Sequence, residues 1–410
     1  MIKESIKKPY CFIKNCFLNI RAEKYLKNNV MKKHKNNKRM KIGFIVFEPE
    51  TWDKLSPIYH ILKTKKEIDV KLIIVPSFDQ ELKLTIHFGK ELQYFSNIDS
   101  DYIPAYKMNE WINIENDGYD YVFYQDPYNV HMPSTLRSNN VVRFTKICYV
   151  PYGFTGSDVF LGLATDSDFF RNVYLGFMDS IKTIDVLNKK FDYTIKNGLQ
   201  HFYDVGYPAY EKYFNYKCRK GIKRILWTPR WSYDPKVGGS HFFEYKDEIL
   251  SLKEKFNDIS IVIRPHPMMF SNFINEGKMS IDEYNDFIEL AKKKGIEISI
   301  GNDISNDFND TDLLITDYSS IFPMYFLTGR PVIYCNSIIK LNKEYAELAD
   351  VSYQCDNWEK IEQCVANLIE GHDPLKIQRE KVIKLQKKKH IGSAERICEI
   401  IINDYNKNVI

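Results

Sequence analysis

The sequence shows little sign of stabilisation by metal ions or disulfides. Its eight cysteines are scattered over 410 residues and form no CxxC pair. Its nine histidines show no zinc-like spacing. We therefore expect reduced thiols, as in a cytoplasmic protein, and no bound metal or other cofactor.

Long apolar runs and nucleotide-loop motifs are also missing. No segment approaches the ~18 apolar residues that a membrane-spanning helix needs. Lys14, Asn15 and Asn19 interrupt the N-terminal apolar residues, so we expect no secretory leader. No GxxxxGK[ST] or GxGxxG loop follows a predicted strand, which argues against ATP-loop and NAD-binding proteins.

Negative charge is scarce at one end of the chain. Residues 1–41 hold eleven Lys and two Arg against two Glu, a net charge of +11. Because the whole chain carries +4, residues 42–410 carry about −7. This distribution excludes a nucleic-acid-binding body with a basic groove and predicts a basic tail on an enzyme-like body.

The tail has the spacing of a basic amphipathic helix. Apolar residues recur every three or four positions between 2 and 29, at Ile6, Tyr10, Ile13, Phe17 and Ile20. One interpretation is that this face lies on an anionic membrane surface, where each basic residue contributes ~1 kcal/mol. The other is a solvated arm or a helix packed on the body.

The rest of the chain alternates strand and helix patterns, which predicts parallel sheets covered on both faces. We expect an α/β protein with two Rossmann-like αβα domains facing a cleft. The predicted organisation is a basic helical tail at 1–40, domains at 41–205 and 206–390, and a C-terminal helix at 391–410. A helix is also predicted at 108–114.

Three predicted strands of the second domain end in polar turns. The strand 313–316 runs into Thr316-Asp317-Tyr318-Ser319-Ser320, at the start of a predicted helix. A helix start attracts anions, because its first N–H groups lack partners. Helix capping alone could account for one of these residues, but not for two consecutive hydroxyls.

The second turn is Arg264-Pro265-His266-Pro267, directly after the predicted strand 260–263. The two prolines hold the histidine on a stiff loop. Arg264 offers a planar fork for phosphate oxygens, and His266 can donate a hydrogen bond or proton to a leaving phosphate. Without a ligand, His266 would be an ordinary turn residue bonded to backbone.

The third turn follows the strand 224–228. It contains Thr228, Pro229 and Arg230 before Trp231. Arg230 could reach a phosphate or stack on a base. Core packing of the tryptophans beside a surface arginine is an equally good interpretation.

Taken in this order, the turns TPRW, RPHP and ITDYSS resemble those of the CDP-glycerol glycerophosphotransferase family, the teichoic-acid primases and polymerases of GT-B fold. The resemblance covers roughly residues 145–405. It implies transfer of glycerol phosphate, or another polyol phosphate, from a CDP-activated donor to a hydroxyl of a lipid-linked polymer. It also implies that His266 and the turn of Ser319 and Ser320 bind the donor diphosphate. Our further donor-binding candidates are Arg264, Asp317, Thr316, Thr228 and Arg230.

The chain departs from the family pattern at two places. Where the family has a Trp-His-Gly turn, whose His is taken to activate the acceptor, this chain has Pro151, Tyr152 and Gly153. A neutral phenol is a poor base, with a pKa of about 10. Tyr152 and the alternative base His131 are therefore our catalytic candidates beside His266, and Gly153 a donor-binding candidate. The Asp that usually follows the Ser-Ser pair is also missing, with Pro323 and Met324 there instead.

The resulting hypothesis is a cytoplasmic enzyme, peripheral on the inner face of the cell membrane. Its expected partners are CDP-glycerol or a related donor, a lipid-linked saccharide or polymer acceptor of teichoic-acid or capsule type, and anionic lipid, but not nucleic acid. Two alternatives remain. One is a GT-B glycosyltransferase that uses a nucleotide sugar. The other is an inactive scaffold at the membrane.

Overall fold

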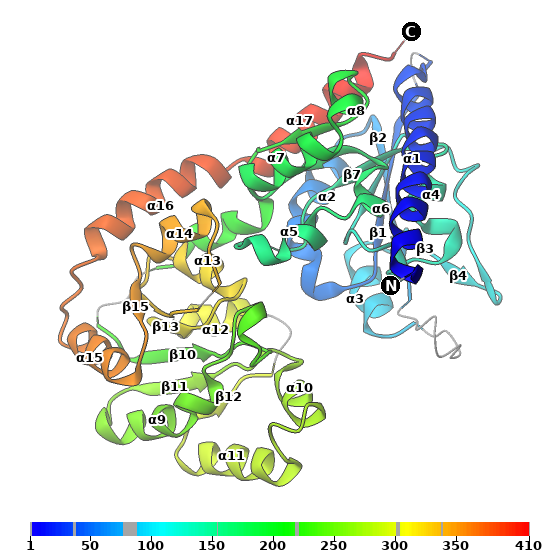
Figure 1. Cartoon of the computed structure of the whole chain (residues 1–410). Coiled ribbons are helices and arrows are strands. Elements are labelled where there is room, and N and C mark those ends of the chain that lie inside the picture. The colour runs from blue at the N-terminus through cyan, green and yellow to red at the C-terminus, as the bar shows by residue number, and fades with distance from the viewer. Residues whose placement is uncertain are drawn as a thin grey trace. The chain divides into compact units, whose positions relative to one another are not determined.

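The computed structural model describes residues 2–35, 38–76, 88–153, 155–217, 221–300, 304–337 and 339–409. The chain forms two compact units (Figure 1). Unit 1 contains Met1–Thr155, Leu161–Ala209 and Gly392–Ile410, and unit 2 contains Gly156–Phe160 and Tyr210–Ile391. Each unit is built on one parallel sheet, so the predicted α/β class with two Rossmann-like domains is confirmed.

Unit 1 contains a seven-stranded sheet in the order β3-β2-β1-β6-β7-β8-β9. All neighbouring strands are parallel. The central strands are buried almost throughout, because they are apolar on both faces. The order reverses between β1 and β6, where open α/β sheets place their ligands. The strands are β1 Met40–Val46, β2 Ile68–Ile74, β3 Ile103–Pro104, β6 Tyr121–Tyr124, β7 Lys146–Tyr149, β8 Val173–Phe177 and β9 His201–Tyr203.

Short helices connect these strands. They are η1 Pro49–Lys54, α2 Ser56–Lys63, α3 Lys90–Ile98, η2 Asn129–His131, η3 Ser134–Leu136, α4 Ser138–Val141, α5 Asp158–Ala164, α6 Ser167–Phe170, α7 Ile181–Lys190 and α8 Asp192–Lys196. The sequence pattern also predicts a helix around 80–95. This stretch lies partly outside the described residues, and within them the helix is α3.

The C-terminal helix α17, Ser393–Asn406, belongs to unit 1 and packs against α2. Its Asp404 accepts hydrogen bonds from the hydroxyls of Tyr121 and Tyr174, each at 2.6 Å. Lys146 Nζ lies 2.6 Å from the same carboxylate. The last helix of the chain is thereby fixed to three central strands of the first sheet.

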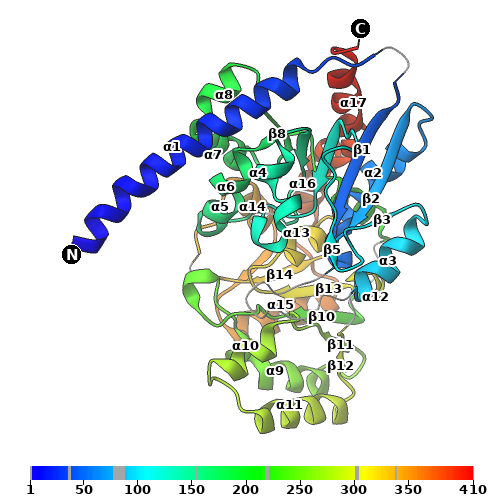
Figure 2. The same cartoon turned by 90° about the vertical axis from the view of Figure 1, so that its right-hand side faces the viewer.

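The N-terminal helix α1, Ile2–Met31, contacts the rest of unit 1 from Asn15 onward, where the Arg171 guanidinium donates to the side-chain oxygens of Asn15 and Asn19 at 3.1 and 2.8 Å. Ala22 and Leu26 are buried, and Asn29 Nδ2 donates to the carbonyls of Val142 and Thr145 at 2.7 and 2.9 Å. The N-terminal half of α1 projects away from the unit (Figure 2). Of the two interpretations of the tail, packing on the body therefore holds for its C-terminal part.

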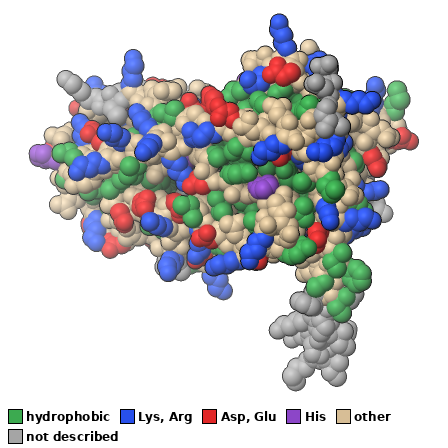
Figure 3. Space-filling model, turned by 90° about the horizontal axis from the view of Figure 1, so that it is seen from above, with side chains coloured by type: hydrophobic (Ala, Val, Ile, Leu, Met, Phe, Trp, Pro, Cys, Tyr) green, Lys and Arg blue, Asp and Glu red, His purple; other side chains and the backbone are tan. Residues whose placement is uncertain are grey.

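The middle of α1 carries exposed apolar side chains (Figure 3). Ile13, Phe17 and Ile20 are 55%, 71% and 66% exposed. Among the described residues, no helix combines the length and apolarity needed to cross a membrane.

Unit 2 contains a six-stranded sheet in the order β12-β11-β10-β13-β14-β15. All neighbouring strands are again parallel, and the order reverses between β10 and β13. The strands are β10 Arg224–Thr228, β11 Ser260–Ile263, β12 Glu297–Ile298, β13 Leu313–Thr316, β14 Val332–Cys335 and β15 Tyr353–Cys355. The strands predicted at 224–228, 260–263 and 313–316 are confirmed.

The helices of unit 2 bury an aromatic-rich core against this sheet. Trp227 on β10 stacks on Phe242 of α9, with ring centroids 5.8 Å apart. The helices are η4 Pro208–Asn215, η5 Pro235–Val237, α9 Phe242–Lys255, α10 Met269–Asn275, α11 Ile281–Lys293, α12 Ile304–Asp310, α13 Ile321–Phe326, α14 Lys343–Ala349, α15 Trp358–Ile369 and α16 Lys376–His390.

The helix predicted at 108–114 is wrong. The segment forms a hairpin of β4, Tyr106–Lys107, and β5, Glu110–Trp111. Met108 and Asn109 have φ of 53° and 64°, as a two-residue hairpin turn requires. The Tyr106 and Trp111 rings lie 5.0 Å apart across the hairpin, and this cross-strand pair stabilises it.

Candidate functional site

The three polar turns of unit 2 lie at one edge of its sheet. β11, β10 and β13 are adjacent and parallel, so their carboxyl ends meet at the same edge. The turn after β10 is central, and β10 and β13 are the strands at which the order reverses. The predicted donor-binding residues thus cluster where a doubly wound sheet binds its ligand.

Two threonines join the ends of β10 and β13. Thr228 Oγ1 donates to Thr316 Oγ1 at 2.7 Å, and both residues are buried. Thr316 Oγ1 also lies 3.2 Å from Ser319 Oγ. Because these hydroxyls bond to one another, their contribution here is to hold the two turns in register.

Asp317 is the polar centre of this edge. Its carboxylate, 1% exposed, accepts hydrogen bonds from the backbone N–H of Arg230 at 2.8 Å and of His241 at 3.3 Å. Its Oδ1 lies 2.6 Å from Nδ1 of the His241 ring. One carboxylate therefore connects the turns after β10 and β13 with the start of α9.

Arg230 is a buried cation without a carboxylate partner among the described residues. It is 6% exposed, and its Nη1 donates to the Tyr318 carbonyl at 2.5 Å. The rings of Tyr318, Phe160 and Trp231 lie 4.9–5.6 Å from its guanidinium carbon. Burial lowers the pKa of Arg230 from its usual value. Such a site favours an anionic ligand, because a buried unpaired charge is costly.

His266 is exposed beside this cluster. Its ring lies 6.3 Å from that of Trp231, and its Nδ1 accepts the Met268 N–H at 3.2 Å. The neutral ring therefore carries its proton on Nε2. Desolvation by neighbouring atoms, then the charge of Arg230, lower the pKa of His266. At neutral pH the residue is a neutral hydrogen-bond donor.

Arg264 and the two serines have partners inside unit 2. Arg264 Nη1 lies 2.6 Å from Asp307 Oδ2 and 3.0 Å from Ser299 Oγ. The Ser319 N–H donates to the Tyr345 hydroxyl at 3.2 Å, and that hydroxyl donates to the Ser319 carbonyl at 2.9 Å. Ser320 is exposed and precedes α13, a helix of six residues. Phosphate binding by Arg264, Ser319 and Ser320 stays a prediction.

The candidates of unit 1 gather around Tyr128, at the switch point of that sheet. The hydroxyls of Tyr128 and Tyr152 lie 2.8 Å apart, and the rings of Tyr128 and His131 5.4 Å apart. His131 Nδ1 pairs with Asp126, which follows β6. This hydrogen bond raises the pKa of His131, against the effect of burial. Gly153 contributes no side chain, and a Cβ there would meet nothing within 4 Å.

Two side chains in these clusters were missed by the sequence analysis. Lys54 is 1% exposed, donates from Nζ to the Gln125 carbonyl, and lies 5.4 Å from the Tyr152 ring centroid. Burial lowers its pKa well below the usual value. Nothing in its local sequence marks it. His241 could have been found, because Gly238-Gly239-Ser240 precedes it at a predicted helix start.

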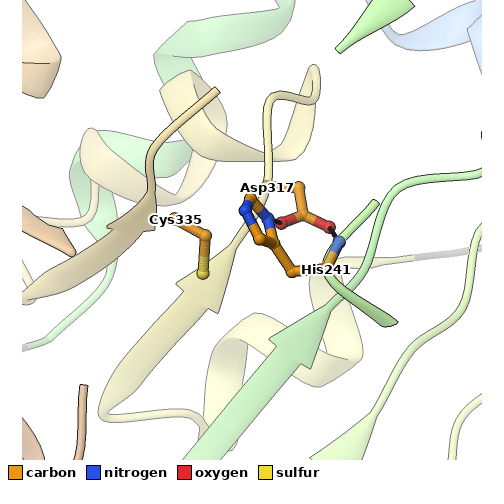
Figure 4. Close-up of side chains that lie close together, drawn as sticks. All are labelled: His241, Asp317 and Cys335. Carbon is orange, nitrogen blue, oxygen red and sulfur yellow. Dashed lines mark hydrogen bonds and ion pairs between the residues drawn. The ribbon is translucent and has the colours of Figure 1, made fainter. Parts of the chain in front are cut away.

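One group of side chains in unit 2 offers metal-ligand atoms. Ligand atoms of His241, Asp317 and Cys335 lie within 4.8 Å of one another. Figure 4 shows the imidazole bonded to the Asp317 carboxylate, with Cys335 close to both.

The central part of the chain matches a known protein family. Residues 190–341 match the family described as CDP-Glycerol:Poly(glycerophosphate) glycerophosphotransferase. This match includes all three turns after β10, β11 and β13. The resemblance inferred from those turns is confirmed.

Curated relatives of the chain act in teichoic-acid synthesis. The teichoic acid poly(glycerol phosphate) polymerase of Staphylococcus epidermidis is 32% identical over 111 residues, 27% of this chain and 14% of the polymerase. The teichoic acid glycerol-phosphate transferase of Staphylococcus aureus is 29% identical over 147 residues, 32% of this chain and 34% of the transferase. The matched regions thus span about a third of these relatives or less.

Solved structures share the fold. The UDP-GlcNAc 2-epimerase of Neisseria meningitidis, solved with UDP-GlcNAc bound, aligns with a TM-score of 0.57 at 14% identity. The alignment covers 90% of this chain and 100% of the epimerase. This likeness shows the fold alone, which is of the GT-B type.

Proposed function

We propose that this chain, whose residues 190–341 belong to the CDP-Glycerol:Poly(glycerophosphate) glycerophosphotransferase family, transfers glycerol phosphate or another polyol phosphate from a CDP-activated donor. The acceptor is a hydroxyl of a lipid-linked cell-surface polymer. The observation that carries this proposal is that the matched residues contain the three polar turns and that these turns share one sheet edge.

Unit 2 is the donor-binding unit in this proposal. Arg230 neutralises a donor phosphate. It is a buried cation, and no carboxylate among the described residues forms an ion pair with it. His266 donates its Nε2 proton in a hydrogen bond to a phosphate oxygen. It does not transfer this proton, since its lowered pKa leaves the ring neutral at pH 7. Positioning and charge neutralisation supply most of the catalysis in phosphoryl transfer.

Unit 1 supplies the residues for the acceptor. In the transfer step, the acceptor oxygen forms a bond to the phosphorus that carries the polyol. The bond from that phosphorus to the bridging oxygen breaks, and CMP leaves with the electron pair. The hydroxyl proton goes to His131, whose Asp126 partner fixes the ring and stabilises the imidazolium. The contact of Tyr152 with Tyr128 suits a positioning role better than that of a base.

A membrane-facing role for α1 is part of the proposal. Ile13, Phe17 and Ile20 are exposed on this helix, and Lys14 and Arg21 lie beside them in sequence. Apolar side chains flanked by cations suit the headgroup region of an anionic leaflet. This arrangement would hold the enzyme peripherally at the inner face of the cell membrane, near a lipid-linked acceptor.

The test is a screen of donors with the purified protein. CDP-glycerol, CDP-ribitol, UDP-sugars and CMP-sugars are compared for thermal stabilisation and for release of the nucleotide in the presence of an acceptor. We expect stabilisation and CMP release with a CDP-polyol. Stabilisation by UDP-sugars alone would indicate the glycosyltransferase alternative, and no nucleotide binding at all would indicate the scaffold.

A further inference from the structure

We propose that the segment Gly238–His241, at the start of α9, is the diphosphate-binding loop of unit 2. In this proposal His241 is a phosphate ligand that Asp317 holds in place. The inference rests on the proposed function in one respect only, since it takes the ligand to be the diphosphate of a nucleotide donor.

The first observation is the direction of Arg230. Its Nε is buried and has no hydrogen-bond partner. The atom lies against Gly238, where an added Cβ would be 2.5 Å from Nε. Buried N–H groups are normally hydrogen-bonded, so an unsatisfied Nε–H that faces this loop indicates that a ligand supplies the acceptor there. A phosphate oxygen supplies both the acceptor and the missing negative charge.

The second observation is the backbone of the loop. Gly238 and Gly239 have φ of 118° and 63°, in the region that glycine enters without strain. Ser337 Oγ donates to the Gly238 carbonyl at 2.8 Å, which fixes the turn. The loop leads into α9, a helix of 14 residues. A tight glycine turn before a helix of this length is a favourable place for a phosphate.

The third observation is the His241 ring. Nδ1 is held by Asp317 at 2.6 Å, which leaves Nε2 as the atom for a ligand. The ring stacks on Tyr245 at 5.2 Å, and its side chain is 17% exposed. Burial lowers the pKa of His241, but Asp317 and then Glu244 raise it more, and the net change is upward. The cationic form of the ring therefore persists to higher pH than in an ordinary histidine.

A metal ion is the competing occupant of this place, because Cys335 lies close by. Two ligand atoms of one tetrahedral zinc, at bonds of about 2.1 Å, lie roughly 3.4 Å apart. The separation of 2.6 Å between His241 and Asp317 is that of a hydrogen bond instead. Burial, followed by the charges of Asp317 and Glu244, raises the pKa of the Cys335 thiol well above its usual value, which opposes the thiolate that a metal needs. We therefore assign the group to phosphate binding.

The experiment measures binding of CDP, UDP and inorganic pyrophosphate to the full chain by titration calorimetry, in buffer containing EDTA. His241→Gln removes the charge of the ring and keeps a polar side chain. His372→Gln is the matched control, because His372 is an exposed histidine of the same unit, 74% exposed in its side chain. The loss of one charge-assisted hydrogen bond should weaken diphosphate binding about 10-fold or more in His241→Gln. The control should bind as the wild type does.

A second measurement is the pH dependence of pyrophosphate binding. Wild-type affinity for pyrophosphate is compared with that of His241→Gln at each pH, because pyrophosphate itself gains charge as the pH rises. The advantage of the wild type should fall as the pH rises through the raised pKa of His241, since His241 then loses its proton. His266, with its lowered pKa, is present in both proteins and does not contribute to this difference.

The outcomes separate this inference from the proposed function. UDP and pyrophosphate binding that depends on His241, without binding of CDP, would refute the CDP donor and uphold the loop. Unchanged affinity and pH profile in a folded His241→Gln protein would overturn the inference, as would failure of the wild type to bind any diphosphate. Binding that requires added Zn²⁺ and is lost in Cys335→Ser would overturn it in favour of a metal site.

Discussion

Gly238 and Arg230 illustrate how a single backbone position can keep a charged side chain in place. The glycine has no Cβ, and the guanidinium fills the space that a Cβ would occupy. A side chain at position 238 would have to displace an arginine that is buried among aromatic rings. At the residue scale, the position of the Arg230 guanidinium therefore depends on a residue without a Cβ at position 238.

We expect Gly238→Ala to weaken nucleotide binding and to destabilise the fold by about 1–3 kcal/mol, the typical cost of a strained backbone conformation. The measurements are CDP affinity and denaturant unfolding. Gly277→Ala is the control, because Gly277 has φ of 65° with nothing within 4 Å of an added Cβ. That variant should show the backbone cost alone and bind CDP normally. Equal binding in both variants would remove the contact with Arg230 from the site.

His131 supports a prediction about the pH dependence of transfer. Asp126 raises the pKa of His131, so the neutral, proton-accepting form becomes dominant only above the usual value of about 6.5. The rate of transfer should rise with pH through this range. His131→Gln should abolish the rise and lower the rate by about 10²-fold.

The control for this prediction is His60→Gln, an exposed histidine on α2 of the same unit. It should leave both the rate and the pH profile unchanged. A normal rate in His131→Gln would transfer the role of base to another group.

Local sequence predicted these sites unevenly, for physical reasons. The turns at Arg230, His266 and Asp317 follow apolar strands, so their common edge was predictable from parallel pairing alone. The ion pair of Arg264 was not predictable, because its partner Asp307 lies 43 positions away, on helix α12. Lys54 was also beyond prediction, since burial of a lysine is decided by tertiary packing.

At the scale of elements, α17 is attached to the first sheet by polar bonds as well as by packing. Strands and long helices were predictable because their apolar periodicity is strong. The hairpin of β4 and β5 was not, since Met108 and Asn109 resemble no common turn pair and the segment is short. That α17 returns to unit 1 follows from contacts of its Asp404 with residues more than 200 positions away.

We expect Asp404→Ala to destabilise unit 1 by about 3–5 kcal/mol, because it leaves the buried Lys146 ammonium unpaired. Calorimetry or urea unfolding measures the effect. Glu399→Ala, an exposed change on the same helix, should stay within about 0.5 kcal/mol of the wild type. A similar small effect for Asp404→Ala would contradict the role of this ion pair.

Asp404 also predicts the acid stability of unit 1. Burial alone would raise its pKa, but Lys146 and the two tyrosine hydroxyls outweigh burial, and the pKa is lowered. A lowered pKa in the folded state stabilises the protein above the unfolded value of about 3.9, and this contribution is lost as pH falls through the folded value. The acid loss of stability should be shallower in Asp404→Asn.

At the scale of the whole molecule, charge is divided between a basic N-terminal region and an acidic remainder. Such a division favours attachment to an anionic surface through one end while the rest is repelled. This division of charge was predictable from the composition. The exposed side chains of α1 were not predictable, because their exposure depends on where the helix packs against the rest of unit 1.

Vesicle sedimentation tests the attachment. We expect the protein to bind phosphatidylglycerol vesicles and not phosphatidylcholine vesicles. A rising salt concentration should release it, because salt screens the charges. Phe17→Glu should weaken binding, because it removes an exposed apolar side chain and adds a negative charge. Met108→Glu, at an exposed apolar residue in a loop, is the control and should bind normally. Equal binding in both variants would exclude α1 as the anchor.

The chain passes between the two units four times, after Thr155, Phe160, Ala209 and Ile391. The first excursion contributes only Gly156–Phe160 to unit 2, where Phe160 stacks on Tyr318 with ring centroids 6.0 Å apart. If unit 2 binds the donor, as we propose, recombination at a single junction cannot transfer the donor specificity of a relative to this chain intact. The short segment Gly156–Phe160 and the long segment Tyr210–Ile391 must be inherited together. Homologues that differ in their donor should therefore differ in both segments.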